Sequence, residues 1–437
     1  MASKALSKTQ VIILAFIIVV STGAGALAYV LWSGIGTSEP IKIGIFHDLD
    51  APAGKSLMQG AVLAAEQLNA EGGILGKQVE VVGEDTDVSI GADPSIFNSA
   101  LTRLLTYHEV DFVIGGSASL GFMVQELVSE HKRIFFETGA NNDEYTQRVI
   151  DEYDIGKYYF RVGGNATSAF AGIKDSLLHL REQTGFNKVG YVGTDLKPST
   201  VAMDELDVVL PELGFDVVYR DVFPLGTFDF TSYFARAEQA GVEIMLPMIV
   251  FNDGIFFVKE YCDRQSPMVI YSGYIGGGVS EFEGWEITDG KCEYTSVSTG
   301  ASIAGYPLTS KTIPDREAYI DRWGEVPSGG SIASYNTLRY ILPDAINRAG
   351  TFETDAVIEA LEKTSIETTD ARNFVFTSSH DVMMGEDPND PYSDYPIVLI
   401  FQWIDEKLVP IYPKKIMQEA GATYTYPDWP GPWDEIS

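Results

Sequence analysis

Short apolar runs alternate along the chain with longer segments in which apolar residues recur as on one face of a helix. The run at 42–46 is followed by 56–69, where apolar residues fall at positions 57, 58, 61, 62, 65 and 68. Short apolar runs bounded by turn residues are typical of buried strands, and the second spacing is typical of amphipathic helices. The pattern therefore predicts a strand at 42–46 and a helix over 56–69.

The same alternation continues in two sets. In the first set, Asp93-Pro94 is an N-cap followed by a first-turn proline, which predicts a helix start. Repeated βα units favour parallel sheets with helices on both faces, so we expect an α/β protein with two doubly wound lobes. The further strands predicted are 79–82, 111–115, 134–137, 188–193, 215–222, 243–248 and 268–272, and the further helices 120–131, 166–183, 199–213, 231–240 and 253–265.

Ligands of such sheets bind at the carboxyl ends of the strands. The loops that leave these ends are therefore the candidate binding loops. They are 47–55, 115–120, 138–143, 193–199, 248–254 and 272–278.

The N-terminal segment 11–32 is apolar and long enough to cross a bilayer as one helix. Lys4 and Lys8 precede it, and the next basic residue is Lys42. The positive-inside rule then gives residues 1–10 as a cytoplasmic stub, 33–40 as a linker and the rest as an ectodomain. We expect a single-pass protein of the cell membrane with its ectodomain on the extracytoplasmic side.

A cleaved signal peptide is the alternative for the same segment. The run Ala26-Leu27-Ala28 resembles a signal-peptidase site behind the apolar core at 11–20. Against cleavage, the apolar stretch continues through Trp32. Both interpretations place the body of the chain outside the cytoplasm.

Composition restricts the classes of molecule that the chain can bind. The chain has 437 residues and a formal net charge of -32, with a hydrophobic fraction of 45% that is ordinary for packed domains. Nucleic acid is an unsuitable partner because phosphate binding needs a basic face. Charge also disfavours docking on anionic lipid.

Motifs of enzymes and metal sites are absent from the sequence. It contains no HExxH, GxSxG or CxxC pattern, and the acidic run 84–93 lacks the glycine and glutamate positions of a calcium loop. We interpret His380-Asp381 as a polar turn, because no nucleophile stands beside it. The expectation is a protein that is not an enzyme and has no metal or cofactor. Cys262 and Cys292 are either a disulfide or two buried thiols.

Several segments in order resemble the branched-chain amino-acid (Leu/Ile/Val) type periplasmic solute-binding proteins of ABC importers. The most specific is NAEGGILGK, within the opening stretch 41–87. Further matches are VDFVIGGSASLG (110–121), FETGANNDEYTQR (136–148), YFRVGGNATS (159–168), GTFDFTSYFARAEQAGVEIM (226–245), SYNTLRYILPDAINRAG (334–350), SSHDVMMG (378–385) and FQWIDEKLVPIYP (401–413).

The resemblance implies a type I periplasmic binding protein, whose two lobes are joined by three hinge crossovers near 160, 297 and 376. Lobe one would comprise 41–160 and 298–376, and lobe two 161–297 and 377–420. Such proteins capture amino acids, amides or related small carboxylates and pass them to an ABC permease. A ligand-sensing ectodomain that signals through a partner membrane protein is the alternative function. The aromatic tail 421–437 is expected to pack on a lobe.

The family's ligand loops map first onto lobe one. Ser119 aligns with the family's ligand-binding serine, and Ser117 lies close to it in sequence. Hydroxyl and main-chain N–H groups at a helix start suit a carboxylate, although Ser119 could instead cap the helix. Ala140 matches a main-chain contact of the family, and Asn141 stands where a threonine is usual.

Lobe two departs further from the family pattern. Asn165 stands near the position of the family's aspartate, as a substitute ligand or as a helix cap. Phe251 adjoins the position of a usual tyrosine. Asp195 and Asp253 are candidates for a solute ammonium, which needs a compensating carboxylate when buried. Tyr274 could stack on the solute or donate to it.

Overall fold

The chain forms two compact units, which are described separately. The computed structural model describes residues 17–20, 27–30, 39–86, 93–117, 119–140, 142–164, 166–271, 274–385, 395–396 and 398–435. Unit one comprises Met1–Gly163, Gly330–Ile366 and Val375–Val382. Unit two comprises Gly164–Gly329, Glu367–Phe374 and Met383–Ser437.

Unit one is built on a seven-stranded sheet of order β1-β2-β4-β3-β5-β6-β7. Strands β3 to β7 pair in parallel, whereas β1 and β2 pair antiparallel with each other and β2 with β4. The central strand β3 is buried along most of its length, as its apolar sequence predicts. The strands are β1 (Ile17–Val20), β2 (Leu27–Val30), β3 (Ile41–His47), β4 (Val79–Asp85), β5 (Phe112–Gly115), β6 (Ile134–Glu137) and β7 (Tyr159–Arg161).

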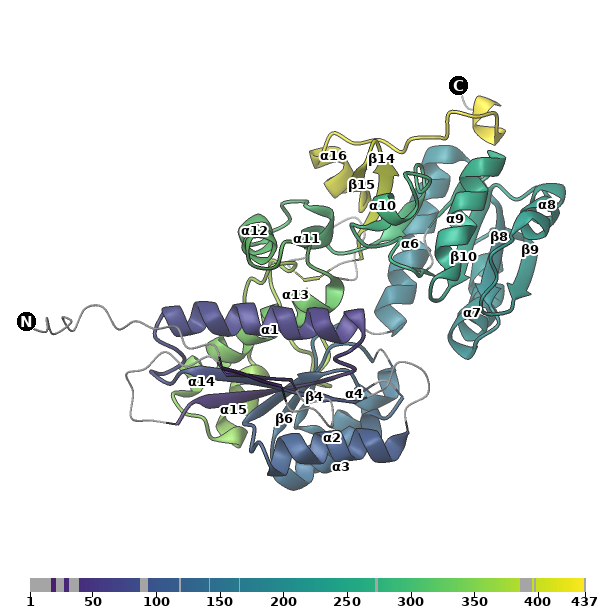
Figure 1. Ribbon diagram of the computed structural model, residues 1–437. Coiled ribbons are helices and arrows are strands. Elements are labelled where there is room, and N and C mark those ends of the chain that lie inside the picture. Colours follow the sequence, from purple (N-terminus) through teal and green to yellow (C-terminus); the bar gives the residue numbers. More distant parts are fainter. Residues whose placement is uncertain are drawn as a thin grey trace, which may run out of the picture. The chain divides into compact units, whose positions relative to one another are not determined.

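Helices cover both faces of this sheet. Figure 1 shows α1 (Pro52–Ala70) on one face and α2 (Pro94–Thr106) with α3 (Gly121–His131) on the other. Asp93 caps α2 by accepting the Ser95 N–H at 2.8 Å, as expected. The remaining helices are α4 (Asp143–Asp151), α5 (Tyr153–Gly156), α13 (Gly329–Asn336), the π-helix Thr337–Ile341, α14 (Leu342–Ala349) and α15 (Thr354–Leu361).

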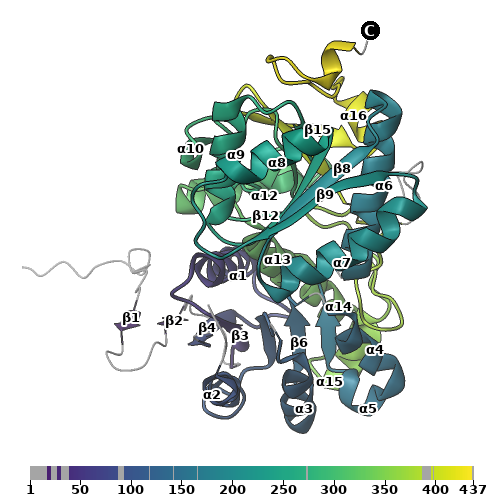
Figure 2. The ribbon, with the colours of Figure 1, turned by 90° about the vertical axis from the view of Figure 1, so that its right-hand side faces the viewer.

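Unit two contains a second parallel sheet of order β11-β10-β8-β9, with β12 also paired to β10. Strands β8 and β9 run side by side in Figure 2. The expected strand 268–272 is observed only as the two-residue β11. The elements are α6 (Ala166–Thr184), β8 (Lys188–Thr194), α7 (Lys197–Glu212), β9 (Asp216–Phe223), α8 (Thr231–Ala240), β10 (Ile244–Ile249), α9 (Asp253–Arg264), β11 (Val269–Ile270) and β12 (Tyr274–Ile275).

A third sheet in unit two is antiparallel and was not predicted. It has the order β13-β14-β15, and a hairpin joins its last two strands. Its first strand comes about a hundred residues earlier, so short-range periodicity gives no sign of this pairing. Its strands are β13 (Ser296–Ser298), β14 (Ile400–Ile404) and β15 (Lys407–Tyr412), accompanied by α10 (Gly284–Ile287), α11 (Ala301–Ala304), α12 (Thr312–Trp323), α16 (Lys414–Glu419) and the 3-10 helix Pro432–Glu435.

The C-terminal tail packs on unit two, which confirms that expectation. Trp429 is buried, and its indole N–H donates to the Ser266 carbonyl at 3.0 Å. Gln402 pairs with the Thr425 backbone in both directions, at 2.8 and 3.0 Å. These contacts extend the core of unit two into the tail.

The chain crosses between the units at places that partly differ from the sequence expectation. The first crossing falls at Gly163/Gly164, near the predicted 160, but the second falls at Gly329/Gly330 instead of near 297. Residues 298–329 belong to unit two because they bond to its Glu367–Phe374 insert. For example, the Ser302 hydroxyl donates to Asp370 at 2.7 Å. The resemblance implies a single third crossing near 376. The chain instead enters unit two for Glu367–Phe374, returns to unit one for Val375–Val382 and crosses to unit two again at Val382/Met383.

The expected membrane segment 11–32 lies outside the described residues except for two pieces. Those pieces are the strands β1 and β2. Across the ranges that the structure describes, no helix is both long and apolar enough to cross a membrane. The stub 1–10 also lies outside the described residues.

Candidate functional site

The carboxyl ends of the parallel strands of unit one carry the candidate loops at 116–120 and 138–142. They follow β5 and β6, which are neighbours in the sheet. Each loop leads directly into a helix, α3 or α4. Parallel pairing therefore brings these two loops together at one edge, as the sequence predicts.

A buried glutamate at the end of β6 joins the two loops. Glu137 is fully buried, and its Oε1 accepts the N–H groups of Gly139 at 2.7 Å and Ala140 at 2.6 Å. Its Oε2 accepts the Ser117 N–H at 2.9 Å and the Tyr159 hydroxyl at 3.0 Å. Burying a carboxylate is costly unless hydrogen bonds compensate it, and here four donors do so.

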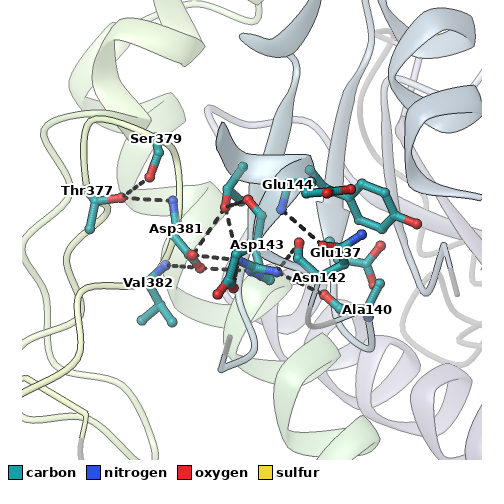
Figure 3. A network of polar contacts seen from close by, with 12 residues as sticks. Glu137, Ala140, Asn142, Asp143, Glu144, Thr377, Ser379, Asp381 and Val382 are labelled. Carbon is teal, nitrogen blue, oxygen red and sulfur yellow. Dashed lines mark hydrogen bonds and ion pairs between the residues drawn. The ribbon is translucent and has the colours of Figure 1, made fainter. Parts of the chain in front are cut away.

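A buried arginine at the end of β7 holds the same loop from its carbonyl side. Arg161 donates to the carbonyls of Ala140 at 3.3 Å and Asn142 at 2.9 Å. Its guanidinium also forms a two-pronged pair with Asp381, at 2.8 and 2.6 Å. Figure 3 shows Asp381 facing the 140–143 segment. The loop backbone is therefore fixed by one buried anion and one buried cation.

The His380-Asp381 pair lies in a polar turn, as expected, in which the His380 N–H donates to the Thr377 carbonyl at 3.0 Å and the Thr377 N–H to the Asp381 carbonyl at 2.7 Å. The sequence did not show that this turn is a buried anchor. Both side chains are buried. The His380 ring stacks on Phe160 with centroids 3.9 Å apart, and its Nε2 lies 3.1 Å from a Glu362 carboxylate oxygen. Burial lowers the pKa of His380, and the Glu362 hydrogen bond opposes that shift. The Arg161 N–H also donates to the His380 carbonyl at 2.9 Å, so this segment is tied to β7.

The structure places the predicted residues of unit one in different roles. Ser117 is fully buried, and its hydroxyl lies 3.4 Å from the Tyr159 hydroxyl. Ser119 is exposed, and it does not cap α3, whose N-cap is Leu120 without a side-chain bond. Ala140 is buried, with its N–H and carbonyl both engaged as described. Asn141 lies outside the described residues.

In unit two the candidate residues are more dispersed. Asp253 begins α9, is buried, and accepts the Gly226 N–H with both oxygens at 3.1 Å. Burial raises its pKa, and the Gly226 bond opposes the shift. Asp195 is exposed, and Phe251 is half-exposed with a φ of 58° in the left-handed region. Asn165 and the side chain of Tyr274 lie outside what the structure describes.

The two cysteines are free, so the structure does not contain the disulfide considered from the sequence. Cys262 lies in the last turn of α9, and Cys292 follows α10 and is buried. Burial raises the pKa of Cys292 to about 12. The thiol is therefore protonated and unreactive at neutral pH.

Sequence reasoning missed Glu137 and Arg161. Each is a charged residue directly after an apolar run at the end of a strand, IFF for Glu137 and YYF for Arg161. A charge in that position is a usable signal, because it must either face solvent or be paired. The pattern alone does not show which of the two applies.

Comparison with known proteins assigns the chain to a family. The family described as periplasmic binding protein matches residues 40–385, and the chain belongs to it. The Leu/Ile/Val-binding protein homolog 8 of Brucella melitensis biotype 1 is 25% identical over 86% of this chain and 91% of the relative. The corresponding homolog 7 of Brucella suis biovar 1 is 23% identical over 89% and 95%.

Solved structures share the fold. An ABC transporter protein of Silicibacter pomeroyi has a TM-score of 0.76 at 18% identity, covering 90% of this chain and all of the other. The substrate binding protein LivJ of Streptococcus pneumoniae, in complex with isoleucine, has a TM-score of 0.67 at 18% identity over 85% and 98%. A solute binding protein of R. palustris, in complex with benzoate, has 0.64 at 12% identity over 85% and 95%.

These likenesses confirm the type I periplasmic binding protein fold with parallel sheets. They also confirm the family that the sequence resembles. Because this family consists of extracytoplasmic binding proteins, they confirm as well the expectation that the chain is not an enzyme.

Proposed function

We propose that the chain captures a small polar solute outside the cytoplasm and delivers it to an ABC importer. The observation that carries this proposal is the family match, which extends through both units. Relatives with Leu/Ile/Val-binding names and similar folds holding isoleucine or benzoate support a small solute with a polar group. The strand-end loops of unit one, whose backbone is bonded by Glu137 and Arg161, are the surface that we propose receives the solute.

A thermal-shift screen of the full chain tests solute capture. The solutes are branched-chain amino acids, small amides, amines and short carboxylates. A ligand of the native state alone stabilises by about 2.7 kcal/mol at a hundredfold excess over its Kd, which is readily measured. Failure of every class in a folded protein would contradict the proposal.

Ser119 is the exposed polar residue that we propose to contact the solute in unit one. Ser119→Ala should weaken binding of any solute that the screen finds. Ser232→Ala, the same change at an exposed position on α8, is the matched control and should bind as wild type does. Asp195, Phe251, Asn141, Asn165 and Tyr274 are the other proposed contacts. Equal binding by the Ser119 and Ser232 variants would remove Ser119 from the site.

Delivery to an importer is tested by purifying the full chain with its membrane partners. A co-purified permease that stimulates solute uptake supports the importer. A co-purified sensor subunit would instead support the alternative, a ligand-sensing ectodomain. We also propose that segment 11–32 anchors the chain in the membrane, and fractionation with N-terminal sequencing distinguishes an anchor from a cleaved signal.

A further inference from the structure

The two loops at the end of β5 and β6 already hold a carboxylate that belongs to the protein. A carboxylate has about four acceptor positions. Those of Glu137 are occupied by the N–H groups of Ser117, Gly139 and Ala140 and by the Tyr159 hydroxyl. Three main-chain donors in the described part of these loops are therefore bonded within unit one.

Ala140 shows the effect most directly. The family resemblance implies a main-chain contact to the solute at this position. In the structure its N–H donates to Glu137 at 2.6 Å, and its carbonyl accepts from Arg161 at 3.3 Å. Figure 3 shows Glu137 and Ala140 close together, on the side of the network away from Asp381. Both polar groups of this residue are thus engaged by buried side chains.

The charge at this edge points in the same direction. Burial lowers the pKa of His47, the last residue of β3, and the carboxylates of Asp48, Glu137 and Asp85 all oppose that shift. These three carboxylates lie at the ends of β3, β4 and β6, and each adds negative potential at the His47 ring. A solute carboxylate placed among them would be repelled, whereas an ammonium or amide N–H would be attracted.

We propose that Glu137 is a built-in carboxylate that occupies three main-chain donors of these loops, those of Ser117, Gly139 and Ala140, so that the chain prefers solutes bearing an amine or amide over the corresponding carboxylates. This inference rests on the proposed function and narrows its solute class. Glu137 acts as a positioning residue for the loops and as a source of negative charge.

The preference is measured by calorimetry on the full chain with a matched series. Benzylamine, benzamide and benzoate share one ring and differ in the polar group, and isoleucinamide is compared with isoleucine in the same way. We expect the amine or amide to bind at least about tenfold more tightly than the acid. A tenfold difference in Kd corresponds to the free energy of about one charge-assisted hydrogen bond. Tighter binding of the acids would overturn the inference and leave the proposed function standing.

Chemical rescue tests the role of Glu137 without a solute. Glu137→Ala leaves the three N–H groups without their acceptor, so acetate or formate should raise its melting temperature by several degrees and leave that of wild type unchanged. Glu243→Ala is the matched control. Glu243 accepts the N–H groups of Asn187 and Lys188 at 2.8 and 2.9 Å but is only half-buried, so water replaces it.

The outcomes separate the two proposals. If no member of the series binds, the proposed function fails for these solutes. The role of Glu137 is then decided by the acetate rescue alone. A folded Glu137→Ala that acetate does not stabilise overturns the inference. Where that variant does not fold, Glu137→Gln takes its place. It should narrow the benzylamine-to-benzoate affinity ratio by about tenfold, and an unchanged ratio would overturn the inference.

Discussion

At the residue scale, two buried charged side chains hold the backbone of a candidate binding loop in place. Glu137 and Arg161 stand at the ends of neighbouring strands and bond the backbone of the 138–142 loop from opposite sides. The sequence predicted the loop and its edge of the sheet, since both follow from hydrophobic periodicity. It did not predict these partners, because the pairing of Arg161 with Asp381 depends on a segment more than two hundred residues away.

Breaking the buried ion pair should destabilise unit one strongly. Arg161→Met leaves Asp381 buried without its partner, so we expect a loss of about 3–5 kcal/mol. Arg348→Met is the matched control, because Arg348 forms a partly exposed i,i+4 pair with Asp344 on α14 and should cost less than about 1 kcal/mol. Urea unfolding followed by circular dichroism measures both variants. Equal losses would show that the Arg161 network contributes little to stability.

The pKa of Glu281 predicts a pH dependence of unit two. Burial raises the pKa of this carboxyl to about 7. Between the unfolded value and pH 7, the folded state holds a proton that the unfolded state releases, so stability falls as pH rises through that range. The loss amounts to at most about 3 kcal/mol above pH 7.

Glu281→Gln tests this dependence. The variant should be more stable than wild type at pH 8 and should lose less stability between pH 5 and pH 8. Glu286→Gln, at a nearby exposed position on α10, should keep the wild-type profile. Urea unfolding followed by tryptophan fluorescence reports unit two, where Trp403 is buried with its indole N–H bonded to the Val279 carbonyl at 3.1 Å. A Glu281→Gln profile that parallels wild type would contradict the assignment.

At the scale of elements, local pattern predicted the long helices and the parallel strands and failed where pairing is distant. Helix 231–240 and strand 134–137 are observed with the predicted bounds, because the apolar pattern that defines each one lies within the element. The short helix α4 and the antiparallel sheet were not predicted. β13 pairs with β14, a strand that begins at residue 400, and no local sequence pattern predicts a pairing over that distance.

The tail behaves as an element of unit two, so truncating its anchor should destabilise that unit. Trp429 is 5% exposed and packs edge-to-face against Tyr261, with ring centroids 5.4 Å apart. Trp429→Ala should cost about 3–5 kcal/mol, as for other large aromatic deletions in cores. Phe228→Ala, at a side chain 76% exposed, should change stability by less than about 0.5 kcal/mol. Thermal unfolding compares the two, and a tail that is only loosely attached would give equal values.

For the whole molecule, the net charge of -32 sets the response to salt. Like charges repel more strongly in the compact state, so screening should favour folding. Raising NaCl from about 0.01 M to about 1 M shortens the Debye length from about 30 Å to about 3 Å. We expect the melting temperature to rise by several degrees, measured by calorimetry. Sucrose at equal osmolality is the control, and an identical rise in both would argue against a charge effect.

The two-lobed plan was predictable at this scale, whereas the exact division of the chain was not. Repetition of βα units indicates two lobes, and the family resemblance gave the first crossing near its observed place but not the later ones. Residues 298–329 were assigned to lobe one but belong to unit two. Hydrogen bonds such as that from Ser302 to Asp370 place them there. Such bonds join segments that no periodicity connects.

The interleaving of the two units has a consequence for synthesis. Unit one needs residues 375–382 to complete its Arg161 network, and unit two needs 398–435 for its third sheet and its tail. A nascent chain therefore emerges from the ribosome without having finished either fold. Both units can therefore complete their cores only once synthesis has reached the C-terminal segments, so neither folds as an independent domain while the chain is still being made.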